Sequence, residues 1–202
     1  MTPFLLGKKV GMTQVFAADG TVIPVTVLHA GPCVVSAVKT VQKDGYSAVQ
    51  IAYGQSKNVN KPQVGHLKAA GVSTNMLREV RLEDDADLPK IGLKLDVTQF
   101  EQIPMVTIAG TSKGKGFAGV IKRHHFHRGP TTHGSDHHRA PGSIGSMFPQ
   151  RVLKGKKMPG HLGHDRVTIK GVDVVSINKS NDTLVVKGSV PGPIGSVLEI
   201  RG

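Results

Sequence analysis

Short runs of apolar residues, many of them β-branched, recur along the chain and are separated by Gly, Pro, Asn and Asp. Runs spaced by about 8–12 residues are typical of an antiparallel β-barrel or sandwich. They occur near both ends of the chain, so we expect the body of the protein to close by pairing early with late segments. The expected strands are 21–28, 33–39, 46–53, 104–110, 166–177, 183–190 and 196–200.

The region 54–104 departs from this pattern. KPQVGHLKAAG (61–71) predicts a short helix that ends at Gly71, and LEDDADLPK (82–90) predicts an acidic surface loop. We interpret 54–104 as a small mixed α/β insertion within the β body.

A third kind of pattern follows. Apolar residues from Phe117 onward fall at helical spacing and predict a helix from Lys115 to His125. From Arg128 to Gly163 there is no periodicity, and Gly and Pro interrupt the chain repeatedly. Ordering such a segment costs about 1–2 kcal/mol per residue in backbone entropy, and its few apolar residues do not offset that cost. We therefore expect an external scaffold to order it.

Together these patterns predict a mainly β protein: an antiparallel β-barrel with a small mixed α/β insertion and a long irregular extension. The expected boundaries are 1–110 and 164–202 for the barrel body, 54–104 for the insertion and 111–163 for the extension.

Charge separates the same regions. Residues 110–170 contain twelve Lys and Arg against two acids, a net charge of +10, whereas the remaining 141 residues carry only +2. Eight of the ten histidines also lie in 110–170. A segregated excess of this size indicates a surface for a polyanion, with nucleic acid as the first choice and an acidic membrane surface as the second.

Other features limit the class of protein. The single cysteine, Cys33, excludes an internal disulfide and a multi-cysteine zinc cluster, and we expect it to be a buried small apolar residue. The start, MTPFLLGKKVGM, lacks the pattern of a signal peptide. The uncharged stretch 21–38 is broken by Pro24 and by Gly31–Pro32, so it predicts two strands rather than a membrane span. We expect a cytoplasmic protein.

The glycine pattern at 114–119 matches GxGxxG, and Asp136 follows at roughly the distance of a ribose-binding acid. A dinucleotide-binding fold would also need a crossover helix and a parallel strand carrying that acid, and the pattern predicts neither. We interpret these glycines as the start of a helix whose amides and nearby lysines meet phosphate.

The histidine cluster admits two chemical alternatives. Its imidazoles could chelate a metal, although neighbouring arginines would repel a cation; the candidates are His124, His125, His127, His133, His137 and His138. The histidines could instead act in acid–base catalysis, but Asp136 is the one carboxylate near them in the sequence that could orient an imidazole. We favour histidines that stack on unpaired bases or donate to phosphate, and predict no catalytic residue, metal or cofactor. A His-rich metalloenzyme and a general nucleic-acid chaperone remain alternatives.

RNA fits the extension better than DNA, because the sequence contains no recognition helix, dimerisation heptad or zinc finger. Isolated lysines such as Lys8, Lys43 and Lys179 are assigned to solvated surface. The residues assigned to RNA contact are Lys113, Lys115, Lys122, Arg123, His125, His127, Arg128, His133, His138, Arg139, Met147, Phe148, Arg151, Lys154, Lys156, Lys157, His161 and Arg166.

Four motifs carry a family resemblance over almost the whole chain: GKKVGMTQVF, AGTSKGKGFAGVIKRHHF, HRAPGSIG and VLKGKKMPGHLGHDRVTIKGVDVV. They resemble the bacterial branch of the L-three family of large-subunit ribosomal proteins. The resemblance implies a β-barrel of the translation-protein type, and an extension that penetrates 23S rRNA toward the peptidyl transferase centre. It also implies primary binding near the 3′ end of that RNA, nucleation of 50S assembly, and neighbours of the L-fourteen and L-nineteen families. Catalysis there belongs to the RNA, and the protein is not an independent homo-oligomer.

The sequence departs from the family pattern at one place. GSIG continues as SMFPQRVLKGKKM, one residue shorter than the usual form, and Gln150 follows Pro149. The glutamine methylation of some members is therefore not carried over to Gln150. Met147 and Phe148 make this tip more apolar than usual, and we favour their burial against bases over packing on a neighbouring protein.

Overall fold

The computed structural model describes residues 3–82 and 88–202, and the chain forms two compact units. We call Met1–Thr111 with Arg166–Gly202 the body, and Ser112–Asp165 the extension. The acidic loop expected at 82–90 lies mostly outside the described residues.

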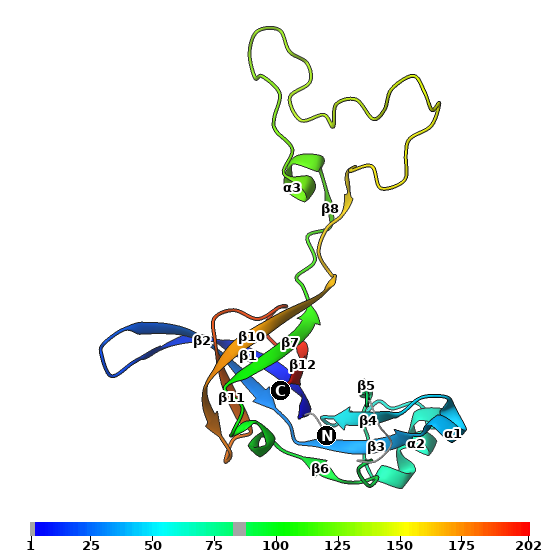
Figure 1. Ribbon diagram of the computed structural model, residues 1–202, viewed down its shortest axis with the longest axis vertical. Helices are drawn as coiled ribbons and strands as arrows, with labels where there is room; N and C mark the ends of the chain where they lie inside the picture. The colour runs from blue at the N-terminus through cyan, green and yellow to red at the C-terminus, as the bar shows by residue number, and fades with distance from the viewer. Residues whose placement is uncertain (1–2, 83–87) are drawn as a thin grey trace. The chain divides into compact units, whose positions relative to one another are not determined.

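Six strands of the body close into an antiparallel barrel, in the order β1-β12-β7-β10-β11-β2. Early and late segments pair as expected: Leu28, in the expected early strand, is opposite Leu184 in a late one. A further early strand, Phe4–Phe16, was not expected from the sequence, and it pairs with the last strand, with Phe4 opposite Arg201 (Figure 1). The predicted mainly β fold with an antiparallel barrel is therefore confirmed. The barrel strands are β1 (Phe4–Phe16), β2 (Val22–Ala30), β7 (Met105–Thr111), β10 (Arg166–Asn178), β11 (Thr183–Lys187) and β12 (Val197–Arg201).

A second, four-stranded sheet follows the order β5-β4-β3-β6. Its strands are β3 (Cys33–Lys39), β4 (Ala48–Tyr53), β5 (Met76–Arg81) and β6 (Lys94–Leu95). The short helical elements of the body are α1 (Val41–Asp44), α2 (Lys61–Leu67), η1 (Lys68–Ala70) and η2 (Val97–Phe100). The helix expected at 61–71 is thus confirmed as α2 and η1, ending at Gly71 with φ of 66°.

β3 and β4 belong to the second sheet, whereas the expected boundary at residue 54 had assigned both strands to the barrel. Gly31, with φ of 93°, and Pro32, which has no N–H to donate, interrupt the chain after β2, so β3 leaves the barrel. The second sheet is completed by β5, whose sequence MLREVR is too charged to have been recognised as a strand.

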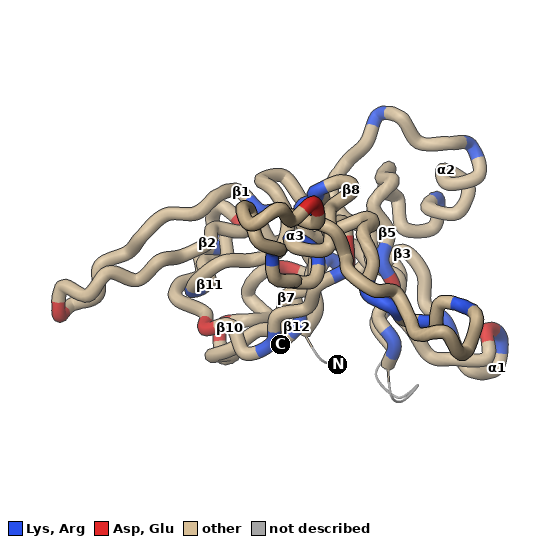
Figure 2. Tube along the Cα trace, turned by 90° about the horizontal axis from the view of Figure 1, so that it is seen from above, with Lys and Arg blue, Asp and Glu red and all other residues tan. Residues whose placement is uncertain are grey.

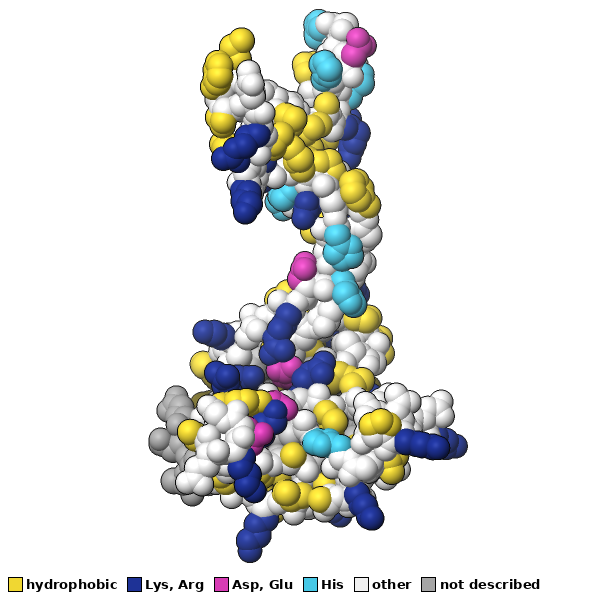
Figure 3. Space-filling view, turned by 90° about the vertical axis from the view of Figure 1, so that its right-hand side faces the viewer, with side chains coloured by type: hydrophobic (Ala, Val, Ile, Leu, Met, Phe, Trp, Pro, Cys, Tyr) yellow, Lys and Arg dark blue, Asp and Glu magenta, His cyan; other side chains and the backbone are white. Residues whose placement is uncertain are grey.

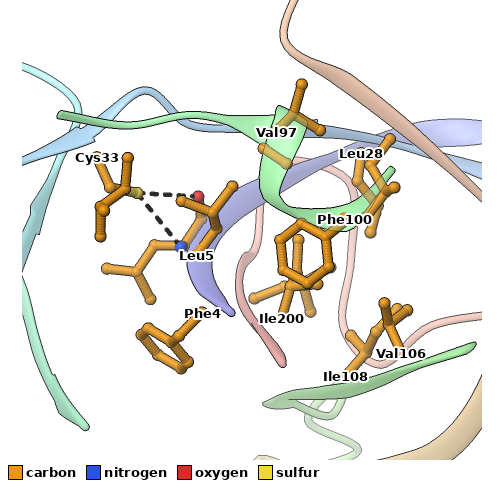
Figure 4. Packing of buried hydrophobic residues seen from close by; sticks show 14 of the residues in the cluster. Phe4, Leu5, Leu28, Cys33, Val97, Phe100, Val106, Ile108 and Ile200 are labelled. Atoms are coloured by element: carbon orange, nitrogen blue, oxygen red, sulfur yellow. Dashed lines mark hydrogen bonds between the residues drawn. The ribbon is translucent and has the colours of Figure 1, made fainter. Parts of the chain in front are cut away.

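One hydrophobic cluster fills the barrel and reaches the second sheet (Figure 4). Cys33 is fully buried, and its sulfur lies 3.4 Å from the Leu6 amide nitrogen and 3.5 Å from the Leu6 carbonyl oxygen. Burial raises the pKa of the Cys33 thiol to about 12. The expectation of a buried, small apolar cysteine is confirmed.

The extension has little regular structure. It contains β8 (Phe117–Ala118), β9 (Gly160–His161) and a short helix, α3 (Val120–His124). The expected helix from Lys115 to His125 is therefore too long at its N-terminal end. Gly114, Gly116 and Gly119 disfavour helix there, and β8 pairs with β9 instead. Between α3 and β9 there is no helix or strand, as the lack of periodicity predicted.

The hairpin of β1 and β2 projects from the barrel and carries few charges apart from the acid at its turn (Figure 2). In the part of the chain that the structure describes, no helix is long and apolar enough to cross a membrane.

Candidate nucleic-acid interface

The extension concentrates the positive charge of the chain. Residues 112–165 include ten Lys and Arg against two Asp, a net charge of +8, together with eight histidines. Lys and Arg (dark blue) and His (cyan) are spread over its surface rather than gathered at one point (Figure 3). Such a distribution suits contact with a polyanion over a long path.

Backbone hydrogen bonds hold the two arms of the extension together where they begin. The Ser112 amide donates to the Asp165 carbonyl at 2.8 Å, and the Lys115 amide donates to the Leu162 carbonyl at 2.8 Å. The Leu162 amide in turn donates to the Gly116 carbonyl at 3.0 Å. This pairing of residues 112–116 with residues 162–165 satisfies backbone polar groups of both segments. It leaves the side chains of Lys113 and Lys115 exposed.

Helix α3 fixes the next part of the extension. Arg123 Nη1 donates to the Met158 carbonyl at 2.7 Å, and His124 Nε2 lies 3.0 Å from the same oxygen. Val120, the first residue of the helix, is buried. Arg123, which the sequence assigned to RNA contact, is therefore half-buried and holds the two arms together.

A lobe closes between Gly129 and His138. The Gly129 amide donates to the His138 carbonyl at 3.1 Å, and His138 Nδ1 lies 2.8 Å from the Pro130 carbonyl oxygen. A Cβ at Gly129 would collide with the His137 backbone, so only glycine permits this approach. His133 and His138 in the lobe, and Arg139 directly after it, are exposed.

The tip of the extension exposes two large apolar side chains. Met147 is 80% exposed and Phe148 is 71% exposed. Ser146 Oγ donates to the Phe148 carbonyl at 2.6 Å, which shapes the turn locally. The described chain itself does not cover these side chains, so they are available to a partner.

Most of the residues that the sequence assigned to RNA contact lie in the extension with exposed side chains. They are distributed along it and do not converge on one site. Those that are exposed there are Lys113, Lys115, Lys122, His125, His127, Arg128, His133, His138, Arg139, Met147, Phe148, Arg151, Lys154, Lys156, Lys157 and His161.

Arg166 lies instead in the body, at the start of β10, and is already bonded. Its guanidinium forms two hydrogen bonds to the buried carboxylate of Glu199, which raise the pKa of Arg166. Arg78 Nε lies 3.4 Å and Arg201 Nη2 lies 3.7 Å from the same carboxylate. Three guanidinium groups thus surround one buried carboxylate, and the sequence pattern had not brought Arg78, Arg201 and Glu199 together.

One exposed aromatic residue was also missed. Phe117 is 81% exposed, although the sequence placed it on the apolar side of a helix. It lies in β8, opposite His161 and close in sequence to Lys115. The glycines around it, in GKGFAG, were the feature that could have indicated an exposed ring beside accessible backbone.

Among the described residues, the histidines of the extension do not come together as a metal site. Over residues 3–82 and 88–202, no group of three His, Cys, Asp or Glu side chains has the arrangement to hold a metal ion.

Comparison with known proteins gives consistent results. The sequence profile described as Ribosomal protein L3 matches residues 89–184. The chain is 52% identical over 200 residues to the large ribosomal subunit protein uL3 of Heliobacterium modesticaldum, covering 98% of this chain and 95% of that protein. It is 50% identical over 206 residues to the large ribosomal subunit protein uL3 of Solibacter usitatus, covering 100% of this chain and 98% of that protein.

Proposed function

Because the chain belongs to the ribosomal protein L3 family, whose members are proteins of the large ribosomal subunit, we propose that it is a structural component that binds rRNA through its extension. The observation that carries this proposal is the extension itself: a segment of net charge +8 with exposed side chains and little apolar burial.

The physical basis is electrostatic. Phosphates neutralised by lysine and arginine release condensed counterions, and this release supplies much of the affinity of proteins for nucleic acid. Contacts with RNA would also compensate the entropy lost when residues between Arg128 and Lys157 are ordered, which their own packing does not. The body, with its buried core, would fold first and present the extension to the RNA.

The family resemblance supports finer statements within this proposal. The protein would be a primary binder near the 3′ end of 23S rRNA, would help nucleate 50S assembly, and would have neighbours of the L-fourteen and L-nineteen families. Its extension would reach toward the peptidyl transferase centre, with Met147 and Phe148 at the tip. In this setting the protein positions RNA, and it performs no reaction of its own.

Salt dependence of rRNA binding tests the proposal. For the purified chain and protein-free large-subunit rRNA, log affinity should fall linearly with log salt concentration, by about 0.7–0.9 per phosphate contacted. The extension variant Lys154/Lys156/Lys157→Ala should reduce both the slope and the affinity. A body variant with the same charge change, Lys43/Lys61/Lys90→Ala, is the control.

Two results would contradict the proposal. One is a wild-type slope shallower than about −2, since that would correspond to only two or three phosphates. The other is an equal affinity for unrelated duplexes and single strands, which would favour a general nucleic-acid chaperone.

A further inference from the structure

The body contains a cleft of about 1000 Å³ whose lining is basic. Lys8, Lys57 and Lys94 line it together with His29, and no carboxylate is among the lining residues. None of these lysines has an ion-pair partner within the described ranges, 3–82 and 88–202. Three ammonium groups around one concavity create a positive potential that attracts an anion.

Strand pairing explains why these side chains meet. Lys8 of β1 is directly opposite His29 of β2, so both side chains lie on the same face of the barrel. In the second sheet, Val34 is opposite both Lys94 and Ala52, and these three residues also share a face. The cleft is therefore built by regular strands on two sides, which makes its shape reproducible.

Loops complete the cleft and are held by hydrogen bonds. The Ser56 amide donates to the Ser73 carbonyl at 2.9 Å, and Ser73 Oγ donates to the Ser56 carbonyl at 3.1 Å. Tyr53 OH lies 3.2 Å from His29 Nδ1, and this contact orients the exposed imidazole. The cleft is thus largely formed before any ligand enters it.

The lining combines positive charge with apolar surface. Pro32, Val34, Ala52 and Val72 contribute apolar area, while the three lysines come from separate segments of the chain. A nucleotide presents both chemistries, because its phosphate is anionic and the face of its base is apolar. A double helix would not enter such a concavity, since its bases are stacked inside and it is recognised across a broad, shallow groove.

We propose that this cleft binds unpaired nucleotides of rRNA, with phosphates at Lys8, Lys57 and Lys94 and a base against His29 and the apolar wall. The inference rests on the proposed function and adds a second RNA site, in the body. It also revises the interpretation of Lys8, which its sequence context had assigned to solvated surface.

The test compares three variants of the full chain that remove the same charge. The cleft variant is Lys8/Lys57/Lys94→Ala, the control is Lys43/Lys61/Lys90→Ala, and the extension variant is Lys154/Lys156/Lys157→Ala. Each is bound to protein-free large-subunit rRNA over a range of salt concentrations, and the RNA is probed for nucleotide reactivity. Thermal unfolding checks that the variants keep the wild-type fold.

We expect the cleft variant to reduce the salt slope by about 2 more than the control, at about 0.7 per single-strand phosphate. One short unpaired segment of the RNA should regain the reactivity of free RNA in the cleft variant alone. His29→Ala should expose nucleotides of the same segment and lower the affinity by about fivefold or more.

A cleft variant that matches the control in slope and reactivity would overturn the inference, as would changes confined to double-stranded RNA. The extension variant separates this failure from that of the proposed function. If only the extension variant weakens binding, the cleft inference fails and the proposed function stands. If only the cleft variant weakens binding, the cleft stands and the role proposed for the extension fails.

Discussion

The guanidinium of Arg166 and the carboxylate of Glu199 face each other in a bidentate pair, with Nη1–Oε1 at 2.8 Å and Nη2–Oε2 at 2.5 Å. Arg166 is the first residue of β10, directly after the extension, and Glu199 lies buried in β12. The pair therefore fixes the strand on which the chain re-enters the barrel. These hydrogen bonds occupy donors of Arg166, a residue whose sequence context predicts RNA contact.

Removal of this carboxylate should destabilise the body. Glu199→Gln leaves Arg166 without a charged partner and weakens the attraction for Arg78 and Arg201. Because the carboxylate is buried but the guanidiniums are half exposed, we expect a loss of about 1–3 kcal/mol in the free energy of unfolding. Urea unfolding of both proteins measures it.

The exposed pair of Lys187 and Asp173, at 3.2 Å, provides the control. Asp173→Asn should change the free energy of unfolding by less than about 1 kcal/mol. An equal loss in the two variants would show that burial of Glu199 adds nothing to its pair.

Free of RNA, the extension should be cut by trypsin before the body. Its lysines and arginines from residue 128 to residue 157 are exposed on backbone without helix or strand. We expect the first cuts at Arg128, Arg139, Arg151, Lys154, Lys156 or Lys157, identified by mass spectrometry of the early fragments. An extension as resistant as the barrel would mean that it has a stabilising core of its own.

Alkaline pH should lower the free energy of unfolding of the body, because the Cys33 thiol titrates differently in the folded and unfolded chains. Burial raises the pKa of its thiol from 9.0 to about 12, so the folded chain keeps a proton that the unfolded chain loses above pH 9. The contribution of the protonated Cys33 thiol to the free energy of unfolding is fully present below pH 9 and declines as pH rises toward 12. The loss amounts to about 1.4 kcal/mol at pH 10.

Urea unfolding at pH 8 and pH 10 tests this effect, with Cys33→Ala as the comparison because it lacks the titrating group. The wild-type chain should lose more stability than the variant between the two pH values. Equal losses would mean that the thiol titrates alike in the folded and unfolded chains.

Phe148→Ala should leave assembly nearly intact and alter the RNA around the tip. A base–aromatic stack contributes about 1–3 kcal/mol, which is small beside the phosphate contacts of the whole extension. Ribosomes carrying the variant should show changed nucleotide reactivity and altered drug sensitivity at the peptidyl transferase centre. Phe16→Ala, which removes an exposed ring from the body, is the control. Unchanged reactivity, drug sensitivity and peptidyl transfer would contradict a role for Phe148 at that centre.

Sequence patterns predicted the strands well where apolar runs contribute to the barrel core. The runs that became β2, β11 and β12 are rich in apolar residues because each places several side chains in that core. The run that became β10 was recognised from its β-branched residues, although Val172 is its one buried side chain. β5 was missed because its exposed positions carry charge, and the sheet to which β3 and β4 belong depends on long-range pairing that no local pattern contains.

The candidate site also has features that the sequence predicted and features that depend on the tertiary fold. Composition located the extension, since charge and glycine content are properties of the sequence itself. The partners of Arg123 and Arg166 depend on residues 35 and 33 positions away, and the cleft lined by Lys8, Lys57 and Lys94 exists only after three segments fold together. Isolated lysines give no indication of such convergence.

The central claim is that the extension attaches this protein to the large subunit. Thr111 and Arg166 are directly opposite each other across β7 and β10, so Asn-Gly in place of residues 112–165 would close a tight hairpin and preserve the barrel. The decisive measurement is sedimentation of tagged full-length and shortened chains with large subunits, followed by a moderate salt wash. We predict that the full chain stays bound and that the folded, shortened chain is released; retention of both to the same extent would contradict the account.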